Sequence, residues 1–577
     1  MATRFLAIIS NKPGGPKVSP SDIACRLGLP CLIDAGSLQV FTSEGDALVL
    51  PGSGGVIVGA LFSRPPNSQF VTSMSTDLAA QISRSGGKAL IQSYWGGYIA
   101  LLTNQLTEVT QVLRDPSGAL PCYLLSVAGA TLVFSDIQIL VQSGLHRPAL
   151  NWEFIPRHLY SFDLRTPDTG LRNVFELLAG FRLSIRGVHV STEAIWSPWD
   201  HVSPDGRPDE ILSNTLKTVV TDCTRAWATR FRKILLSVSG GLDSSIVASV
   251  LAADRTSVQC VTLSTNEPEG DESDYARQLT TGLGLSLEAE MYRLCDIDIT
   301  KSTSAFLPRP MQSAFGQAVR RIKFGIAERD HIDAFFGGIG GDNVFCHTRS
   351  ATPLVDQILA NGANGQTWRT LDDICRMTGN SAFDVLKMAW GRMRTGNASY
   401  HWRGTPGYLN PKLIPEFVLT HPWLVTPRHA LPGKAVHVAM LARMQGTIDG
   451  FERERPPQID PLLSQPIVEA CLHIPSWRWV SHGQDRSIAR LAFADQIPAG
   501  LGQRRSKGGP DAFAYQLVEA NKTILREFLL GGLIAQQGVL DLTSLEQALT
   551  PHGIIRSPHH VQLLGLAEAE AWARHWS

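Results

Sequence analysis

The pattern of apolar positions changes near residue 203 and divides the chain into two parts. Before that point, short apolar segments alternate with stretches rich in glycine, proline and serine, a pattern typical of β-strands joined by turns. The predicted strands lie at residues 5–9, 47–50, 56–62, 94–102, 108–113 and 131–134. The polar residues 203–209 then have the composition of a linker.

Strand-like and helical segments alternate after the linker. Predicted strands lie at residues 234–238, 258–263, 288–292 and 332–336, and predicted helices at residues 246–253, 274–283 and 314–327. This alternation predicts a parallel sheet covered by helices, and the chain beyond about residue 350 is mostly helical. We therefore expect a β-rich α+β domain at residues 1–202 and an α/β domain with a helical extension at residues 210–577.

Composition limits the classes of function. The 577 residues are too many for one core, and 52 basic residues balance 52 acidic ones, so neither nucleic acid nor a membrane is expected as a partner. The nine cysteines form no CxxC pair, so neither a disulfide framework nor a zinc site is indicated. The apolar run at residues 5–9 is too short for a signal peptide, and no run could span a bilayer. We expect a cytoplasmic protein.

A glycine-rich turn between a predicted strand and a predicted helix is the most informative motif. It consists of Ser239, Gly240, Gly241, Leu242, Asp243 and Ser244. Glycines let the backbone approach a phosphate, and the amides at a helix start point toward it. The lysine that ends a Walker A loop is missing. The turn resembles the pyrophosphate loop of ATP pyrophosphatases, which split ATP between the α and β phosphates. The alternative is a simple turn before a buried helix.

A second glycine cluster, residues 337–343, follows the predicted strand that ends at residue 336. The carboxyl ends of parallel strands share one edge of a sheet, where ligands bind. Asp243 and Asp342 are therefore candidate ligands of one Mg²⁺, which usually takes one or two carboxylates together with phosphate oxygens. Gly340 and Gly341 are candidate nucleotide contacts. Either aspartate alone would more often be a helix cap or a turn residue.

Two further segments carry charge. The acidic residues 267–274 precede a predicted helix, whose amino terminus favours negative charge, and this structural explanation is the stronger one. Residues 504–509 form a basic glycine loop that contains Lys507. Such a loop is a solvated surface turn in most proteins, whereas a lysine aimed at phosphates or at developing negative charge would be functional.

These motifs occur in the order and approximate spacing of asparagine synthetases, which the chain resembles over most of its length. The matching segments are residues 239–245, 269–277, 338–345, 460, 468–470 and 504–509, with looser matches at residues 113–123 and 195–200. The resemblance implies a class II amidotransferase-like sandwich of the Ntn type followed by a pyrophosphate-loop domain. It also implies ATP and Mg²⁺ as cofactors, catalytic roles for Asp342 and Lys507, and adenine contacts near Leu263 and Ser264.

The departures from that family bear on the substrate. A class II amidotransferase needs a cysteine after the initiator methionine, and Ala2 stands there instead. We therefore expect no glutamine hydrolysis, so the amine must come from another source, most simply the acyl substrate. β-Lactam synthetases and the macrolactam synthetases of lasso peptides similarly retain the domain without the cysteine.

Position 339 separates those two groups. Asparagine synthetases have glutamate there and β-lactam synthetases tyrosine, whereas Ile339 can neither accept nor donate a proton. A peptide α-amine, with a pKa of about 7.7–8.0, is partly neutral at pH 7 and needs a base less than an alkyl amine does. His347 is the nearest alternative base, although a lone histidine there is more often structural. Residues 340–345 also look most like those of lasso cyclases.

The sequence thus predicts an ATP-dependent macrolactam synthetase acting on a precursor or core peptide, with a leader peptidase and a leader-binding protein as partners. Residues 400–403 are a candidate lining for the peptide pocket, or simply aromatic packing. Other hypotheses are a β-lactam synthetase-like or ammonia-dependent asparagine synthetase-like enzyme, and a non-catalytic ATP sensor. A sulfur-transferring enzyme of tRNA would want a basic surface and paired cysteines, which are not visible.

Overall fold

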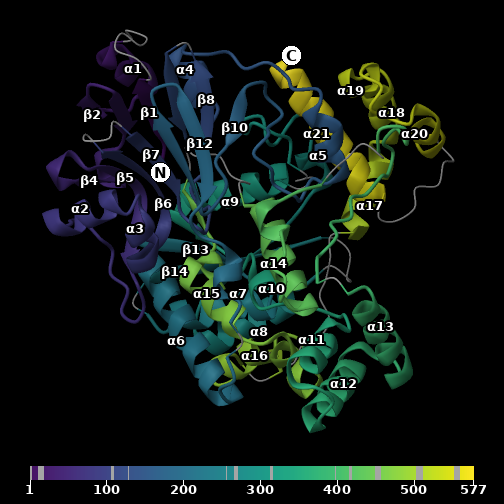
Figure 1. Ribbon diagram of the computed structural model, residues 1–577. Helices are drawn as coiled ribbons and strands as arrows, with labels where there is room; N and C mark the ends of the chain where they lie inside the picture. The colour runs from purple at the N-terminus through teal and green to yellow at the C-terminus, as the bar shows by residue number, and fades with distance from the viewer. Residues whose placement is uncertain are drawn as a thin grey trace.

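Three β-sheets and a set of helices make up the described part of the protein (Figure 1). The computed structural model describes most of the chain. The described residues are 3–10, 19–104, 109–127, 129–203, 205–254, 256–265, 271–311, 316–396, 398–414, 419–448, 456–498, 500–501, 511–550 and 559–577.

The first part of the chain forms two six-stranded antiparallel sheets. One has the strand order β10-β8-β9-β1-β3-β2 and the other β12-β11-β7-β6-β5-β4. The strands are β1 (Phe5–Ser10), β2 (Cys31–Ala35), β3 (Leu38–Thr42), β4 (Ala47–Leu50), β5 (Gly55–Ser63), β6 (Tyr94–Asn104), β7 (Val109–Arg114), β8 (Tyr123–Val127), β9 (Ala130–Phe134), β10 (Val174–Glu176), β11 (Phe181–Arg186) and β12 (His189–Ala194).

Both faces of the central strands are buried, which is why they read as continuous apolar runs. In β1, Phe5 and Ala7 pack between the two sheets, where they join Val56 of β5. Leu6 and Ile8 alternate with them and pack on the opposite face, in a second core. The result is the sheet sandwich expected for the amino-terminal part.

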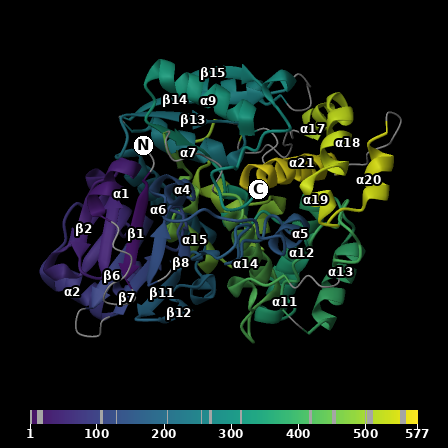
Figure 2. The same ribbon diagram turned by 90° about the horizontal axis from the view of Figure 1, so that it is seen from above.

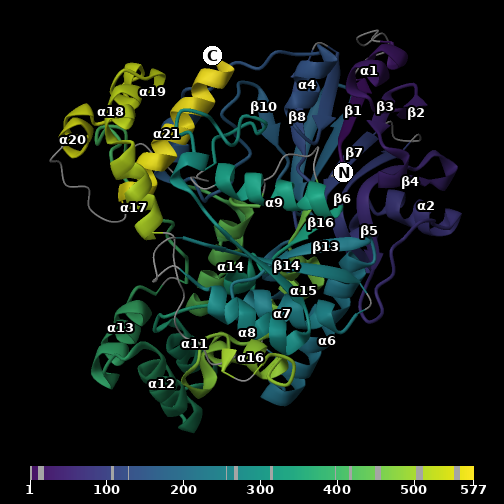
Figure 3. The ribbon, with the colours of Figure 1, turned by 180° about the vertical axis from the view of Figure 1, so that it is seen from behind.

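The second part contains a parallel sheet with the order β15-β14-β13-β16-β17. Its strands are β13 (Lys233–Ser237), β14 (Ser257–Ser264), β15 (Ser286–Met291), β16 (Ala334–Phe336) and β17 (Gln458–Ile459). Helix α9 (Gly316–Asp330) covers one face, and α6 (Asp209–Ala228), α7 (Leu242–Ala252) and α8 (Ser273–Leu283) cover the other (Figure 3). The α/β architecture predicted from the alternation of segments is therefore confirmed.

The remaining helices surround these sheets, and the carboxy-terminal helices, yellow in Figure 2, share a buried apolar core with strands β1, β8 and β9 of the sandwich. They include α1 (Pro20–Leu27), α2 (Thr76–Arg84), α3 (Lys88–Ser93), α4 (Gln138–Ser143), α5 (Phe154–Tyr160), α10 (Gly341–Val344), α11 (Thr352–Asn361), α12 (Gly365–Thr378), α13 (Ala382–Arg394), α14 (Pro432–Gln445), α15 (Gln465–His473), α16 (Ser487–Ala492), α17 (Asp511–Ala520), α18 (Lys522–Leu530), α19 (Leu533–Gln536), α20 (Leu542–Ala548) and α21 (His559–Trp576). In the part of the chain that the structure describes, no helix is long and apolar enough to cross a membrane.

Buried charges join the sandwich to the second part. Glu469 of α15 accepts hydrogen bonds from Arg64 Nη1, at 2.5 Å, and from Trp196 Nε1, at 2.9 Å. Glu176, with no exposed surface, pairs with Arg114, Arg165 and Arg309, the last of which belongs to the second part. The sandwich is thus held against the parallel sheet by specific polar contacts as well as by apolar packing.

Candidate active site

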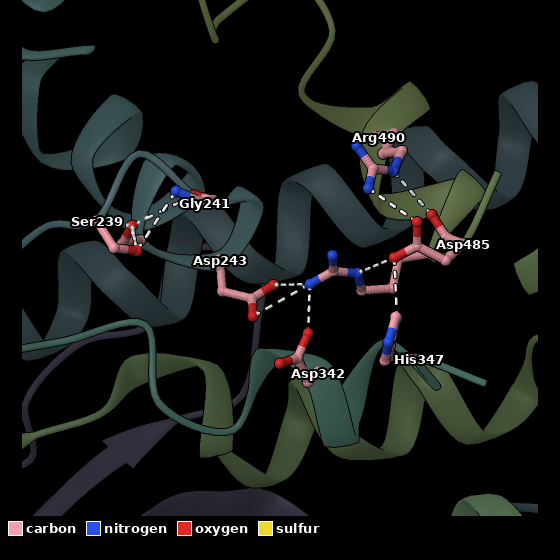
Figure 4. Close-up of polar contacts among 9 residues, drawn as sticks. Ser239, Gly241, Asp243, Asp342, His347, Asp485 and Arg490 are labelled. Carbon is pink, nitrogen blue, oxygen red and sulfur yellow. Dashed lines mark hydrogen bonds and ion pairs between the residues drawn. The ribbon is translucent and has the colours of Figure 1, made fainter. Parts of the chain in front are cut away.

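The first glycine turn connects the end of β13 to the start of α7. Gly240 adopts a φ of 67°, a left-handed conformation that favours glycine. The turn is held by its own serines: Ser244 Oγ accepts from Ser239 N at 3.3 Å, and Ser239 Oγ accepts from Gly241 N at 3.4 Å (Figure 4). Helix α7 begins without a side-chain cap, so its first amides face the adjoining cavity with the polarity that binds an anion.

The second glycine turn follows β16 and packs directly on the first. A Cβ atom at Gly338 would lie 2.5 Å from the amide nitrogen of Ser244, so no larger residue fits between the two backbones. A Cβ atom at Gly341 would collide with the carboxylate of Asp243. The glycines therefore have a physical role, which is to let two loops from neighbouring strands meet.

This packing brings Asp243 and Asp342 together, as the sequence predicted, but a guanidinium lies between them. Arg486 Nη1 is 3.1 Å and 3.3 Å from the two oxygens of Asp243 and 2.5 Å from Asp342 Oδ1 (Figure 4). The Arg486 side chain is only 12% exposed. No signal in the sequence pointed to this arginine, which precedes α16 and is far from both aspartates along the chain.

The donor set fits a magnesium ion that also binds phosphate oxygens. Two carboxylates already share one positive group, and hard oxygen donors are what Mg²⁺ prefers. Among the residues that the structure describes there is no group of three or more His, Cys, Asp or Glu that could hold a metal without such help. Asp243 and Asp342 would be the protein ligands, and Arg486 would have to move aside.

Asp485 organises a cationic group beside the two aspartates. It accepts from His347 Nδ1 at 3.0 Å, from Arg486 Nε at 2.7 Å and from Arg490 Nη2 at 3.0 Å. Although burial raises it, the hydrogen bond from His347 and the charges of the two arginines hold the pKa of Asp485 well below its usual range. His347 lines the cavity in a fixed orientation, and its role as a base stays a prediction.

A cavity of about 660 Å³ opens between the two loops and α9. One wall is apolar, with Val261, Leu263, Tyr292 and Val319, which suits a flat base such as adenine. Leu263 thus lines the cavity, and its contact with adenine stays a prediction. Ser264 is 8% exposed and lies outside the lining, and its carbonyl accepts the amide of Tyr292 at 3.0 Å.

The loop residues divide into those that line the cavity and those that shape it. Gly240, Gly340 and Gly341 are outside the lining, whereas Ser239, Gly241, Leu242, Asp243, Ser244 and Asp342 contribute to it. Ile339 lines the cavity and is 47% exposed, so an aliphatic side chain faces the ligand space at that position.

A lysine in the cavity wall was missed by the sequence analysis. Lys323 of α9 is 3% exposed and donates to Gln458 Oε1 at 2.9 Å, and Gln458 Nε2 donates to Asp460 Oδ1 at 2.9 Å. Burial lowers the pKa of Lys323 to about 8 and raises that of Asp460 to about 6. Only Asp460 had been noticed, as part of a motif.

Some predicted residues cannot be placed. Lys507, with the whole basic loop at residues 504–509, lies outside the described residues, as does Ala2. Tyr400, His401 and Trp402 line a different hollow of about 360 Å³, together with Tyr160 and other residues. These three residues are not among those that line the 660 Å³ cavity, and their role as a lining for the peptide pocket stays a prediction.

Comparison with known proteins gives one family. The sequence matches the family described as asparagine synthase over residues 215–410 and 460–574, which is more than half of the chain. No curated protein matches it.

Two solved structures are similar at 12% identity: the allosteric regulatory enzyme of purine biosynthesis and glutamine phosphoribosylpyrophosphate amidotransferase from B. subtilis. The first has a TM-score of 0.20 and covers 50% of this chain and 74% of its own. The second has a TM-score of 0.22 and covers 58% and 90%. At such TM-scores neither likeness carries an argument.

Proposed function

The chain belongs to the asparagine synthase family and is an ATP-dependent carbon–nitrogen ligase, and from that premise we propose that it closes a macrolactam in a peptide freed of its leader. The acyl donor would be the side-chain carboxylate of an Asp or Glu, and the nucleophile the peptide's own amino terminus. A leader peptidase and a leader-binding protein would supply the substrate.

The observation that carries this proposal is Ile339 in the cavity wall. The residue is 47% exposed and lines the cavity, at the position where an acid or a tyrosine would handle the proton of an incoming amine. A peptide α-amine, with a pKa of about 7.7–8.0, is already partly neutral at pH 7 and tolerates the loss of that group. Ala2 in place of a nucleophilic cysteine supports an amine that does not come from glutamine.

Each residue of the candidate site would have its own role in the reaction. The carboxylate of the peptide attacks the α-phosphorus of ATP, and the amides of Gly241 and Leu242, with Ser239 and Ser244, hold the departing pyrophosphate. Asp243 and Asp342 would hold Mg²⁺, which when bound neutralises phosphate charge. The amine then attacks the acyl-adenylate carbonyl and expels AMP. Lys507 would stabilise the charge that develops on the oxygens.

The test is a reaction with a leader-free peptide that contains one internal Asp or Glu. With ATP and magnesium, the peptide should lose one water and its amino terminus should become unreactive to amine reagents, while ATP gives AMP and pyrophosphate. An N-acetylated peptide should still exchange pyrophosphate into ATP but should not cyclise. Equal cyclisation of the acetylated peptide, or ADP and phosphate as the main products, would refute the proposal.

A further inference from the structure

Lys323 places a buried positive charge in the wall of the 660 Å³ cavity. Lys323 is 3% exposed. It lies one helical turn after Val319 on α9, and Val319 also lines the cavity. Its Nζ atom lies 4.6 Å from the centre of the Phe335 ring. Long charged side chains are rarely this buried unless another group compensates the charge.

The compensating charge is separated from Lys323 by one amide. Gln458 accepts from Lys323 with its oxygen and donates to Asp460 with its nitrogen, both at 2.9 Å. The amide dipole therefore has its negative end at the cation and its positive end at the anion, an arrangement that favours charged Lys323 and charged Asp460. At pH 7 the lysine is mostly protonated, since burial lowers its pKa only to about 8.

The two charges face different spaces. Lys323 lines the 660 Å³ cavity, Asp460 lines a second cavity of about 140 Å³ beside residues of the sandwich such as Ser117, and Gln458 lines both. The cation Lys323 thus borders the 660 Å³ cavity, while its counter-charge, Asp460, borders the other cavity. A buried wall of this polarity favours an anionic ligand group.

The sheet order separates Lys323 from the phosphate-binding turn. That turn follows β13, whereas Lys323 is tied to Phe335 in β16 and to Gln458 in β17, the next two strands in the sheet. Ile339 belongs to the loop after β16, on the same side. The turn after β13 also has its own cationic neighbour in Arg486, which pairs with Asp243.

We propose that Lys323 binds the carboxylate of the acyl donor and holds it for adenylation. This assignment rests on the proposed function and adds the residue that recognises the acid. The carboxylate would accept a charge-assisted hydrogen bond from Nζ, and Gln458 and Asp460 would keep the ammonium in place and charged.

The test compares wild type with Lys323→Met and Lys323→Gln, the second of which keeps a donor for Gln458 without the charge. The probe acid is an N-acetylated peptide with one internal Asp, and free L-aspartate is the second acid. Acid-dependent pyrophosphate exchange gives the acid KM, and calorimetry without acid gives the Kd of magnesium–ATP. The control is Lys301→Met, whose side chain is 78% exposed.

Loss of a charged hydrogen bond should raise the acid KM about tenfold to a hundredfold in both Lys323 variants, with the ATP Kd within about twofold of wild type. The Lys301→Met control should have the same acid KM and the same ATP Kd as wild type. A weaker ATP affinity with an unchanged acid KM would mean that Lys323 faces a phosphate. An unchanged acid KM and ATP Kd in a folded Lys323→Gln protein would mean that the lysine has only a structural role. Either result overturns the assignment. If the wild type adenylates aspartate but not the peptide, the proposed peptide substrate is refuted, and the Lys323 variants are then compared by their KM for aspartate. If the wild type adenylates neither acid, both the proposed function and the role of Lys323 are overturned.

Discussion

Replacing Arg486 by methionine should leave two carboxylates facing each other in the candidate site. In the wild type, Arg486 Nη1 lies 3.1 Å from Asp243 and 2.5 Å from Asp342, so one positive charge is shared by the two carboxylates. Methionine keeps most of the volume and removes the charge. We expect the variant to be less stable than wild type without magnesium and to regain part of that stability when Mg²⁺ takes the place of the guanidinium.

The magnitude follows from these distances. Oxygens bound to one nitrogen at such lengths are at most about 6 Å apart, where two like charges repel by about 3 kcal/mol at an effective dielectric constant of 20. Because Asp342 is 34% exposed, screening reduces this repulsion to about 2 kcal/mol. The lost charged hydrogen bonds add about 2 kcal/mol. For a chain of 577 residues, the sum corresponds to a midpoint lower by about 3 °C.

Thermal unfolding with EDTA and with saturating Mg²⁺ is the assay. Magnesium should raise the midpoint of Arg486→Met by about 1–2 °C and change wild type less. Arg490→Met is the matched control, because Arg490 Nη2 binds the same Asp485 at 3.0 Å, whereas the guanidinium that binds both Asp243 and Asp342 is that of Arg486. The control should lose stability without gaining a response to magnesium. An Arg486→Met protein that ignores magnesium, or a control that responds equally, would refute the argument.

Two further predictions follow from buried and paired carboxylates. Glu176→Gln should lower the free energy of unfolding by about 3–5 kcal/mol at pH 7, because three buried arginines lose their carboxylate. The arginines outweigh burial and hold the pKa of Glu176 below its usual value, so the carboxylate stabilises the fold above a pH of about 4.3 and this stabilisation is lost as the pH falls. The difference in unfolding free energy between variant and wild type, measured in urea, should therefore shrink at low pH. The exposed Glu193→Gln should stay within about 1 kcal/mol of wild type at both pH values. Asp243→Ala and Asp342→Ala should each abolish pyrophosphate exchange while circular dichroism stays native, and a variant with near-normal exchange and unchanged magnesium dependence would not have lost a ligand.

Much of the site could be predicted because its core is local in sequence. Strand, glycine turn and helix follow one another within a few residues, and the predicted strands at 234–238 and 332–336 are β13 (Lys233–Ser237) and β16 (Ala334–Phe336). Their carboxyl ends share one edge of a parallel sheet, so Asp243 and Asp342 had to be near each other once the alternation was recognised.

Some strands left no such trace. In β12 (His189–Ala194) all six residues are exposed, so the strand lacks the buried alternate positions on which pattern analysis depends. It pairs with β11 (Phe181–Arg186) at the edge of its sheet, and backbone hydrogen bonds that carry no side-chain signature hold it there.

The sequence alone determined the two-part architecture, the glycine-rich turn after β13 and the absence of an acid or tyrosine at Ile339, because each of these is a short pattern with its own physical cause. The tertiary structure decided which charges surround the turn. Arg486 lies 243 residues from Asp243 along the chain, and the hydrogen bonds that link Lys323 to Asp460 pass through Gln458, 135 residues away from Lys323. Nothing in the local pattern distinguishes such an arginine or lysine from a surface residue, because its partner is set by how distant helices pack on the sheet.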